Sequence, residues 1–180
     1  MFYLTEAEDY VRIAPENFGL PIREAIIKEL EKAYENFIDE ELGVVIRVID
    51  VKSVGEGIII PEDGAVYYNA SFTLLVFKPQ LNELVFGKIS QITSFGAFMN
   101  IGVLDALIHI SQTMDDYVTF SKANTLLGRN SKKSLKKGDL CLARIVAISY
   151  KTIPPKIGLT MRQAGLGKLE WIEKEKKKKK

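Results

Sequence analysis

Cysteine, histidine and tryptophan each occur only once in the 180 residues. The single cysteine, Cys141, excludes an internal disulfide and a zinc site built from several cysteines, and its apolar neighbours predict a core position. There is no run of 18 apolar residues, so we expect no membrane span. The first ten residues carry Glu6, Glu8 and Asp9 and no basic residue, unlike a signal peptide. We expect a cytoplasmic protein without a metal or another cofactor.

No set of residues typical of an active site is present either. His109 lies two residues before Ser111, but neighbours along one strand point in different directions, so the pair does not indicate a nucleophile. Asp115 and Asp116 are more typical of a cap or a solvated loop than of acid–base catalysis. A small hydrolase around these residues is the enzymatic alternative, and we expect no catalytic site in this chain.

Positive charge is scarce in the first part of the chain and abundant in the second. Residues 1–80 contain 7 lysines and arginines against 15 acidic residues, a net charge of −8. Residues 81–180 contain 18 against 8, a net charge of +10. Such asymmetry indicates that the second part meets a polyanion. Six of its lysines, Lys174 and Lys176–Lys180, form a tail that we expect to be frayed and solvated.

The first 80 residues predict one helix on a mostly antiparallel sheet. Strands are indicated at 2–13, 44–51 and 67–77, the last with alternate apolar residues on one face: Phe72, Leu74 and Val76. Pro21 suits the first position of a helix. Apolar residues then recur with helical spacing at Ile22, Ile26, Leu30, Tyr34 and Phe37 or Ile38. Glycine-bearing segments predict tight turns on either side of an isoleucine run: Gly55-Glu56-Gly57 and Asp63-Gly64.

The remainder predicts an all-β barrel of five short strands. They are expected at 84–93, 97–101, 106–110, 140–150 and 156–161. A long polar stretch, 119–138, separates the third strand from the fourth and is rich in basic residues, among them Arg129, Lys132, Lys133, Lys136 and Lys137. This pattern suits an OB-fold, whose second and third strands bind nucleic acid. The fold class is therefore an α+β domain followed by a five-stranded OB barrel.

Two phenylalanines stand where the first two barrel strands meet, Phe95 and Phe98. Strand alternation places Asn100 on the same face as Phe98, and Met99 on the opposite face. An aromatic residue that shares a face with asparagine is suited to stacking on unpaired bases. The alternative is that both rings fill the barrel. Alternation also turns His109 away from the barrel interior, where it is either structural or part of the same surface.

Residues 82–162 resemble the S-one RNA-binding domain, which has an OB-fold. The shared segments are Gly87-Lys-Ile89, Phe95-Gly-Ala-Phe98, Asp105-Ala-Leu-Ile-His-Ile-Ser111, Lys137-Gly-Asp139 and Lys156-Ile-Gly-Leu-Thr160. The resemblance implies an RNA-binding face with Phe95, Phe98, His109 and Lys156, to which we add the basic residues Lys88 and Arg144. Ala106 and Ser149 depart from the family pattern, and so does the basic insertion before Lys137.

The whole chain also resembles one narrower family, the E-prime proteins of archaeal DNA-directed RNA polymerase, which form the larger half of the stalk heterodimer. The motifs are Val11-Arg-Ile-x-Pro-x-x-Phe-Gly19, Asp50-Val-Lys52, Met114-Asp-Asp-Tyr117, Leu159-Thr-Met-Arg-Gln163 and Leu166-Gly-Lys-Leu-Glu-Trp171. The last is the most specific, although Ala164-Gly165 before it departs from the family. The resemblance implies three parts: a polymerase-docking domain (1–80), an RNA-binding barrel (81–163) and a C-terminal segment (164–180).

The partners implied are the polymerase core subunits, the smaller stalk subunit as the other member of a heterodimer, and emerging single-stranded RNA. The docking candidates are the residues of the two glycine-bearing turns: Gly55, Glu56, Gly57, Asp63 and Gly64. The alternative is a free-standing RNA-binding factor of RNA decay or translation, which would need neither these turns nor residues 166–171. An RRM fits less well, because its two helices are missing.

Overall fold

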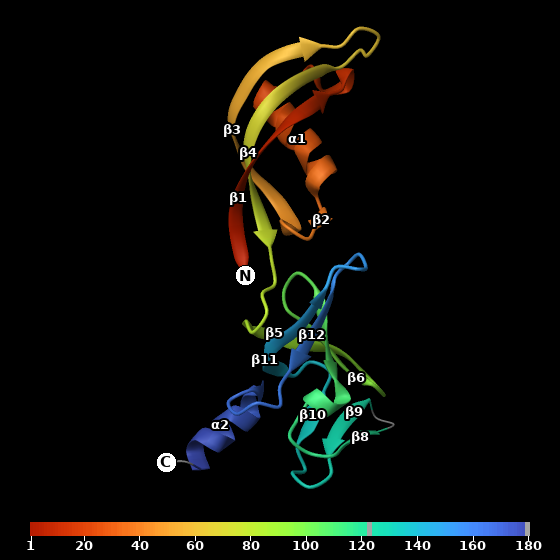
Figure 1. The fold of residues 1–180 in the computed structure, drawn as a ribbon, viewed down its shortest axis with the longest axis vertical. Helices are drawn as coiled ribbons and strands as arrows, with labels where there is room; N and C mark the ends of the chain where they lie inside the picture. The colour runs from red at the N-terminus through yellow and green to blue at the C-terminus, as the bar shows by residue number, and fades with distance from the viewer. Residues whose placement is uncertain (122–123, 179–180) are drawn as a thin grey trace. The chain divides into compact units, whose positions relative to one another are not determined.

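The computed structural model describes residues 1–121 and 124–178, and the chain divides into two compact units, Met1–Lys78 and Pro79–Lys180 (Figure 1). The α+β and OB-type architectures expected for them are confirmed. Within the described part of the chain, no helix is long and apolar enough to cross a membrane.

Unit 1 is a four-stranded antiparallel sheet with one α-helix packed against one face (Figure 1). Its elements are β1 (Phe2–Ile13), η1 (Pro15–Asn17), α1 (Ile22–Tyr34), β2 (Ile38–Asp39), β3 (Gly43–Ile59) and β4 (Val66–Phe77), and the sheet order is β1-β4-β3-β2. The core between helix and sheet is wholly apolar: Val11, Ile13, Ala25, Ile26, Leu30, Val45, Val48, Val51, Ala70, Phe72, Leu74 and Val76. The predicted inward face of β4 is thereby confirmed.

The predicted helix is present where it was expected, but it ends earlier than the apolar spacing predicted. Pro21 precedes α1 as its cap residue, and the helix ends at Tyr34. Ile26 and Leu30 are buried as expected, but Ile22 is exposed. Phe37 lies beyond the helix because its backbone carbonyl accepts a hydrogen bond from the N–H of Val45 and so belongs to the edge of the sheet.

The predicted turn at Gly55-Glu56-Gly57 is wrong, because all three residues lie within β3. β3 pairs with β4 through four register shifts, the last between Val54 and Gly57, so the extra residues are absorbed as a bulge. The chain reverses further on, where the N–H of Asp63 donates to the carbonyl of Ile60 (3.2 Å). At this turn the left-handed backbone belongs to Glu62, with φ of 72°, and not to Gly64.

Unit 2 contains a closed barrel formed by the five predicted strands. They are β5 (Leu84–Thr93), β6 (Gly96–Asn100), β7 (Asp105–His109), β11 (Leu140–Ser149) and β12 (Lys156–Thr160). The order β12-β7-β6-β5-β11 closes because β11 also pairs with β12. Cys141 is fully buried as expected, and burial raises the pKa of its thiol to about 12.

The polar stretch between β7 and β11, for which no strand was predicted, contains regular secondary structure. After η2 (Ile110–Gln112) it forms a separate three-stranded sheet, in the order β10-β9-β8. Its strands are β8 (Val118–Ser121), β9 (Thr125–Gly128) and β10 (Ser134–Lys136). Leu126 and Leu135, paired across β9 and β10, are fully buried and provide this sheet with a core.

The C-terminal segment is also ordered where a frayed tail was expected. β13 (Gly167–Lys168) pairs with β11, and α2 (Leu169–Lys178) follows it. Trp171 is buried, and its ring lies 5.4 Å from Nζ of Lys133. The last two lysines of the predicted tail, 179 and 180, lie outside the described residues.

Candidate nucleic-acid interface

Four adjacent strands of the barrel, β5, β6, β7 and β12, present aligned side chains on their outer surface. Lys88 pairs with Asn100, which pairs with Asp105. In the next row Phe98 pairs with Leu107, which pairs with Gly158. Lys156 is exposed at the start of β12, two residues before Gly158. We call this surface the barrel face: Lys88, Phe98, Asn100, Asp105, Leu107, His109 and Lys156.

The two phenylalanines are on the outside of the barrel. Met99 and Ala97 are fully buried, whereas Phe98 is half-buried on the opposite side of the strand and Phe95 is 48% exposed. The rings meet edge to face with 6.0 Å between their centroids. The predicted alternation of β6 is confirmed, and the interpretation of both rings as barrel filling is wrong.

His109 is exposed at the end of β7, and its neighbours determine which ring nitrogen carries the proton. The backbone N–H of Ser111 donates to Nδ1 of His109 (3.3 Å), and Oγ of Ser111 lies 2.8 Å from the same atom. A backbone N–H can only donate, so Nδ1 must be an acceptor and the neutral ring carries its proton on Nε2. His109 therefore offers an N–H donor at Nε2. Ser111 orients this ring, a role that the strand pattern alone does not predict for it.

β6 and β7 approach each other closely beside His109. Gly96 pairs with His109 across the two strands. A Cβ atom on Gly96 would lie only 2.2 Å from the backbone oxygen of Ile108, so no other residue fits without moving the strand. Gly96 is buried, and its missing side chain is what allows the two strands to pack this closely next to His109.

Asp105 is a polar residue of the barrel face that was not among the predicted RNA-binding residues. Its Oδ1 accepts a hydrogen bond from Nδ2 of Asn100 (3.0 Å), and its Oδ2 lies 3.4 Å from the hydroxyl of Ser90. The signal was present in the strand alternation: counting back by two from His109 reaches Leu107 and then Asp105. A carboxylate and an amide beside an aromatic ring offer acceptors and donors to base edges.

Arg144 is the one predicted RNA-binding residue that the register does not place beside the others. It lies on β11, where it pairs with Leu84 of β5 and Thr160 of β12. The residue is half-buried, and its Nε atom has no hydrogen-bond partner among the described residues. For Arg144 to contact RNA as predicted, the bound RNA must extend round the barrel from the barrel face to β11.

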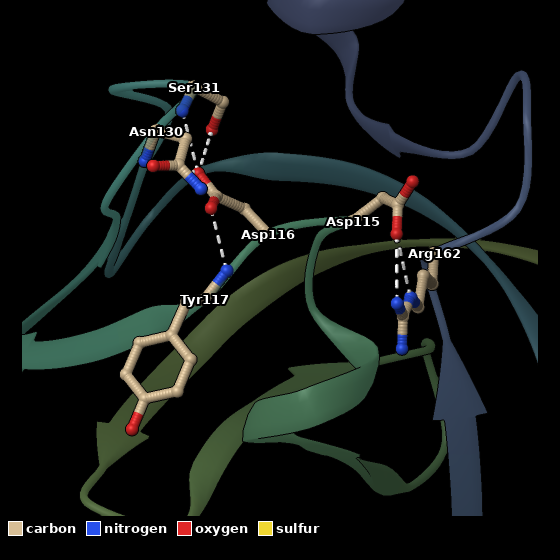
Figure 2. A pocket seen from close by; sticks show the side chains of 6 residues that line it. All are labelled: Asp115, Asp116, Tyr117, Asn130, Ser131 and Arg162. Atoms are coloured by element: carbon tan, nitrogen blue, oxygen red, sulfur yellow. Dashed lines mark hydrogen bonds and ion pairs between the residues drawn. The ribbon is translucent and has the colours of Figure 1, made fainter.

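The two aspartates after η2 hold loops together, as expected of caps (Figure 2). Oδ2 of Asp116 accepts from the backbone N–H of Asn130 (2.9 Å) and from the N–H and hydroxyl of Ser131 (2.7 and 2.8 Å), and its Oδ1 accepts from the N–H of Tyr117 (2.6 Å). These bonds, with the N–H of Ser131 first, lower the pKa of Asp116 to about 2.

Asp115 pairs instead with Arg162, whose NH2 group lies 2.9 Å from Oδ1. The two aspartates line an open pocket of about 580 Å³ together with Tyr117, Asn130, Ser131 and Arg162. Since both carboxylates are already occupied, the pocket does not have the free acid and base that hydrolysis needs. Nowhere in residues 1–121 or 124–178 do three histidine, cysteine or acidic side chains gather as metal ligands.

The predicted docking residues lie at one end of the sheet of unit 1. Glu56 and both neighbouring glycines are exposed in the bulge of β3. Asp63 accepts two hydrogen bonds from Arg12 (3.0 and 2.7 Å) and one from the hydroxyl of Tyr67 (2.7 Å). These bonds, with those of Arg12 first, hold the pKa of Asp63 well below its usual range. Asp63 therefore fixes the turn, while Gly64 is exposed with open space around it.

Comparison with known proteins identifies relatives over the full length of the chain. Residues 8–64 match the SHS2 domain found in the N terminus of Rpb7p/Rpc25p/MJ0397, and residues 78–152 match the S1 RNA binding domain. DNA-directed RNA polymerase subunit Rpo7 of Sulfolobus acidocaldarius is 42% identical over 177 residues, which are 97% of both chains. The Rpo7 subunit of Saccharolobus solfataricus is 39% identical over 180 residues, 98% of this chain and 100% of that one.

A more distant relative is DNA-directed RNA polymerase III subunit rpc8 of Schizosaccharomyces pombe. It is 37% identical over 105 residues, which are 58% of this chain and 52% of that protein. The two Rpo7 relatives are matched over 97% and 98% of this chain, and so through both compact units. The chain therefore belongs to the Rpo7 family of DNA-directed RNA polymerase subunits.

Proposed function

We propose that this chain is a cytoplasmic stalk subunit of a DNA-directed RNA polymerase that docks on the core enzyme through unit 1 and binds emerging single-stranded RNA through unit 2. The observation that carries the RNA-binding part is the barrel face. Its half-buried Phe98 and exposed His109 lie between two lysines on four adjacent strands. Aromatic rings stack on bases of any sequence, and lysines attract phosphates, so the surface suits a transcript whose sequence is not fixed.

The charge of the two units supports this division. The net charge of +10 over residues 81–180 attracts a polyanion, whereas the net charge of −8 over residues 1–80 repels it. Because unit 1 repels RNA, we expect it to bind protein instead. RNA bound to unit 2 is thus kept away from the docking surface by electrostatics alone.

The docking surface that we propose is the turn between β3 and β4. Ile58, Ile59 and Ile60 are all exposed, Ile59 by 71%, although a monomer normally buries such a run. The ion pair between Arg12 and Asp63 holds this turn in one conformation, which lowers the entropy cost of binding a partner. The neighbouring Gly55, Glu56, Gly57 and Gly64 belong to the same proposed surface. The second protein partner, the smaller stalk subunit, would bind the same chain as a heterodimer.

A free-standing factor of RNA decay or translation is not favoured, because the match to Rpo7 subunits includes unit 1 as well as the barrel. The proposal is tested with the full chain and an Ile59→Asp variant, each tagged and recovered from a native lysate. The unaltered chain should recover polymerase subunits and bind single-stranded RNA. The variant should lose the polymerase and keep its RNA affinity. Recovery of polymerase by both proteins would refute the proposed docking surface.

A further inference from the structure

Residues 117–138 contain six lysines and arginines and no acidic residue. They belong to the insertion by which the chain departs from the S-one pattern, and none of them is part of the barrel face. Of the basic residues described here, Lys133 has protein partners: its Nζ lies 2.8 Å from Glu175 and 5.4 Å from the ring of Trp171. Among the described residues, no ion pair engages Arg129, Lys132, Lys136 or Lys137, and all four are exposed.

The insertion is a built structure and not a loose loop. Leu126 and Leu135 anchor the sheet, and the carboxylate of Asp116 ties the β9–β10 loop to the start of β8 through four hydrogen bonds (Figure 2). Gly128 makes this possible, because a Cβ atom there would lie 2.7 Å from Oδ2 of Asp116 and 2.6 Å from Oγ of Ser131. The loop that carries Arg129 and Lys132 is therefore held in place before any ligand arrives.

At this end of the sheet an aromatic ring and a guanidinium are held side by side. The backbone N–H of Arg129 donates to the carbonyl of Tyr117 (2.9 Å), and the guanidinium carbon lies 5.1 Å from the centroid of the tyrosine ring. Tyr117 is 67% exposed, and Figure 2 shows its ring pointing away from the Asp116 carboxylate. A guanidinium plane and an aromatic ring are both surfaces on which an unstacked base can lie.

The other end of the insertion joins the barrel face directly. Lys136 and Lys137 precede Gly138, whose N–H donates to the carbonyl of Ile89 (2.8 Å). Cε of Lys88 lies 3.8 Å from the position that a Cβ atom on Gly138 would take. The insertion therefore rejoins the barrel next to Lys88, directly after Lys136 and Lys137.

We propose that the insertion carries a second contact surface for single-stranded RNA, formed by Tyr117, Arg129, Lys132, Lys136 and Lys137, which we call the insertion surface. This inference rests on the proposed function, because it extends the path of the same RNA beyond the barrel face. Single-stranded RNA is favoured over an acidic protein because the site combines spaced cations with an exposed ring. Phosphates and unpaired bases match both features, whereas acidic side chains match only the cations.

The test compares an Arg129→Ala/Lys132→Ala variant and a Tyr117→Ala variant with the unaltered full chain. Affinity is measured for RNA of about 4 and about 16 nucleotides, the range of site sizes of a single OB-fold. Each lost phosphate contact lowers the slope of log affinity against log salt by about 0.7 for single strands, so the double variant should lose about 1.4 on the long RNA. Tyr117→Ala should weaken the long RNA at least about 5-fold, the lower limit for one stacking aromatic.

The short RNA should bind all these proteins equally, because the barrel face alone accommodates it. An Arg23→Ala/Arg47→Ala variant is the matched control: it also removes two exposed charges, but from unit 1, and it should leave both RNAs unaffected. In the unaltered chain, the long RNA should also protect Lys132 from acetylation. This last measurement does not depend on any variant being folded.

Unchanged slope and affinity for the long RNA, with Lys132 unprotected, would overturn the insertion surface while leaving the barrel face intact. Loss of polymerase recovery without loss of RNA affinity would also overturn it and assign the insertion to a protein contact. If the unaltered chain binds neither RNA, the proposed function itself fails. The outcomes are therefore distinguishable.

Discussion

Replacing Phe98 with alanine tests the barrel face directly. The ring is half-buried and meets the ring of Phe95 edge to face. Removing one stacking aromatic costs about 1–3 kcal/mol of binding free energy, which corresponds to a loss of affinity of roughly 5- to 150-fold. The edge-to-face contact with Phe95 contributes a further ~0.5–1.5 kcal/mol to folding, a small part of the stability of a domain. The variant should therefore stay folded and bind poorly.

The assay is fluorescence anisotropy with a short labelled single-stranded RNA, together with thermal unfolding followed by circular dichroism. Phe86→Ala is the control, since this exposed phenylalanine of the same barrel pairs with Leu142 on β11, away from β6 and β7. The salt dependence should be unchanged in Phe98→Ala, because stacking releases no counterions, whereas Lys156→Ala should lower the slope by about 0.7. Equal loss of affinity in the Phe86 and Phe98 variants, or unfolding of Phe98→Ala, would refute the barrel face.

Three further predictions concern single residues. Ser111→Ala removes the hydroxyl that helps to orient the His109 ring and should weaken RNA binding several-fold, whereas Ser111→Thr should preserve binding; nitrogen NMR should show the Nε2–H tautomer in both variants, because the backbone N–H of residue 111 still donates to Nδ1. The low pKa of Asp116, about 2 against an ordinary 3.8, adds stability that is complete above about pH 4 and is lost as pH falls through 2. Denaturation monitored by the fluorescence of Trp171 should therefore separate the wild type from Asp116→Asn at neutral pH, with the two curves converging near pH 2. Gly55→Val should reduce recovery of polymerase without affecting RNA binding, because its Cβ would lie 3.2 Å from the backbone oxygen of Asn69 and disturb the bulge.

The barrel strands and the orientation of their side chains were predictable because strand alternation is a local property. Met99 and Phe98 point in opposite directions whatever the rest of the chain does, and the same holds for Ile108 and His109. The helix of unit 1 was predictable for the same reason, from the spacing of Ile26 and Leu30. In each case the pattern of one segment determines which face is buried.

The insertion sheet was missed because its strands are short and its stability comes from residues outside them. Asp116 holds the loop between β9 and β10 from a position before β8, and Lys133 contacts Trp171, 38 positions further along the chain. A sequence pattern cannot show such contacts between distant segments. The ordering of the C-terminal helix has the same origin, since Lys168 just before it pairs with Asp139 (3.0 Å) on the barrel.

Gly55 and Gly57 were wrongly taken as a sign of a turn, whereas the turn predicted at Asp63-Gly64 is present. Gly57 lies inside β3, where a Cβ atom would come within 2.8 Å of the ring of Tyr68, and Gly96 lies against the backbone of β7. At both positions the missing side chain allows two strands to approach closely, and neither requires a reversal of the chain.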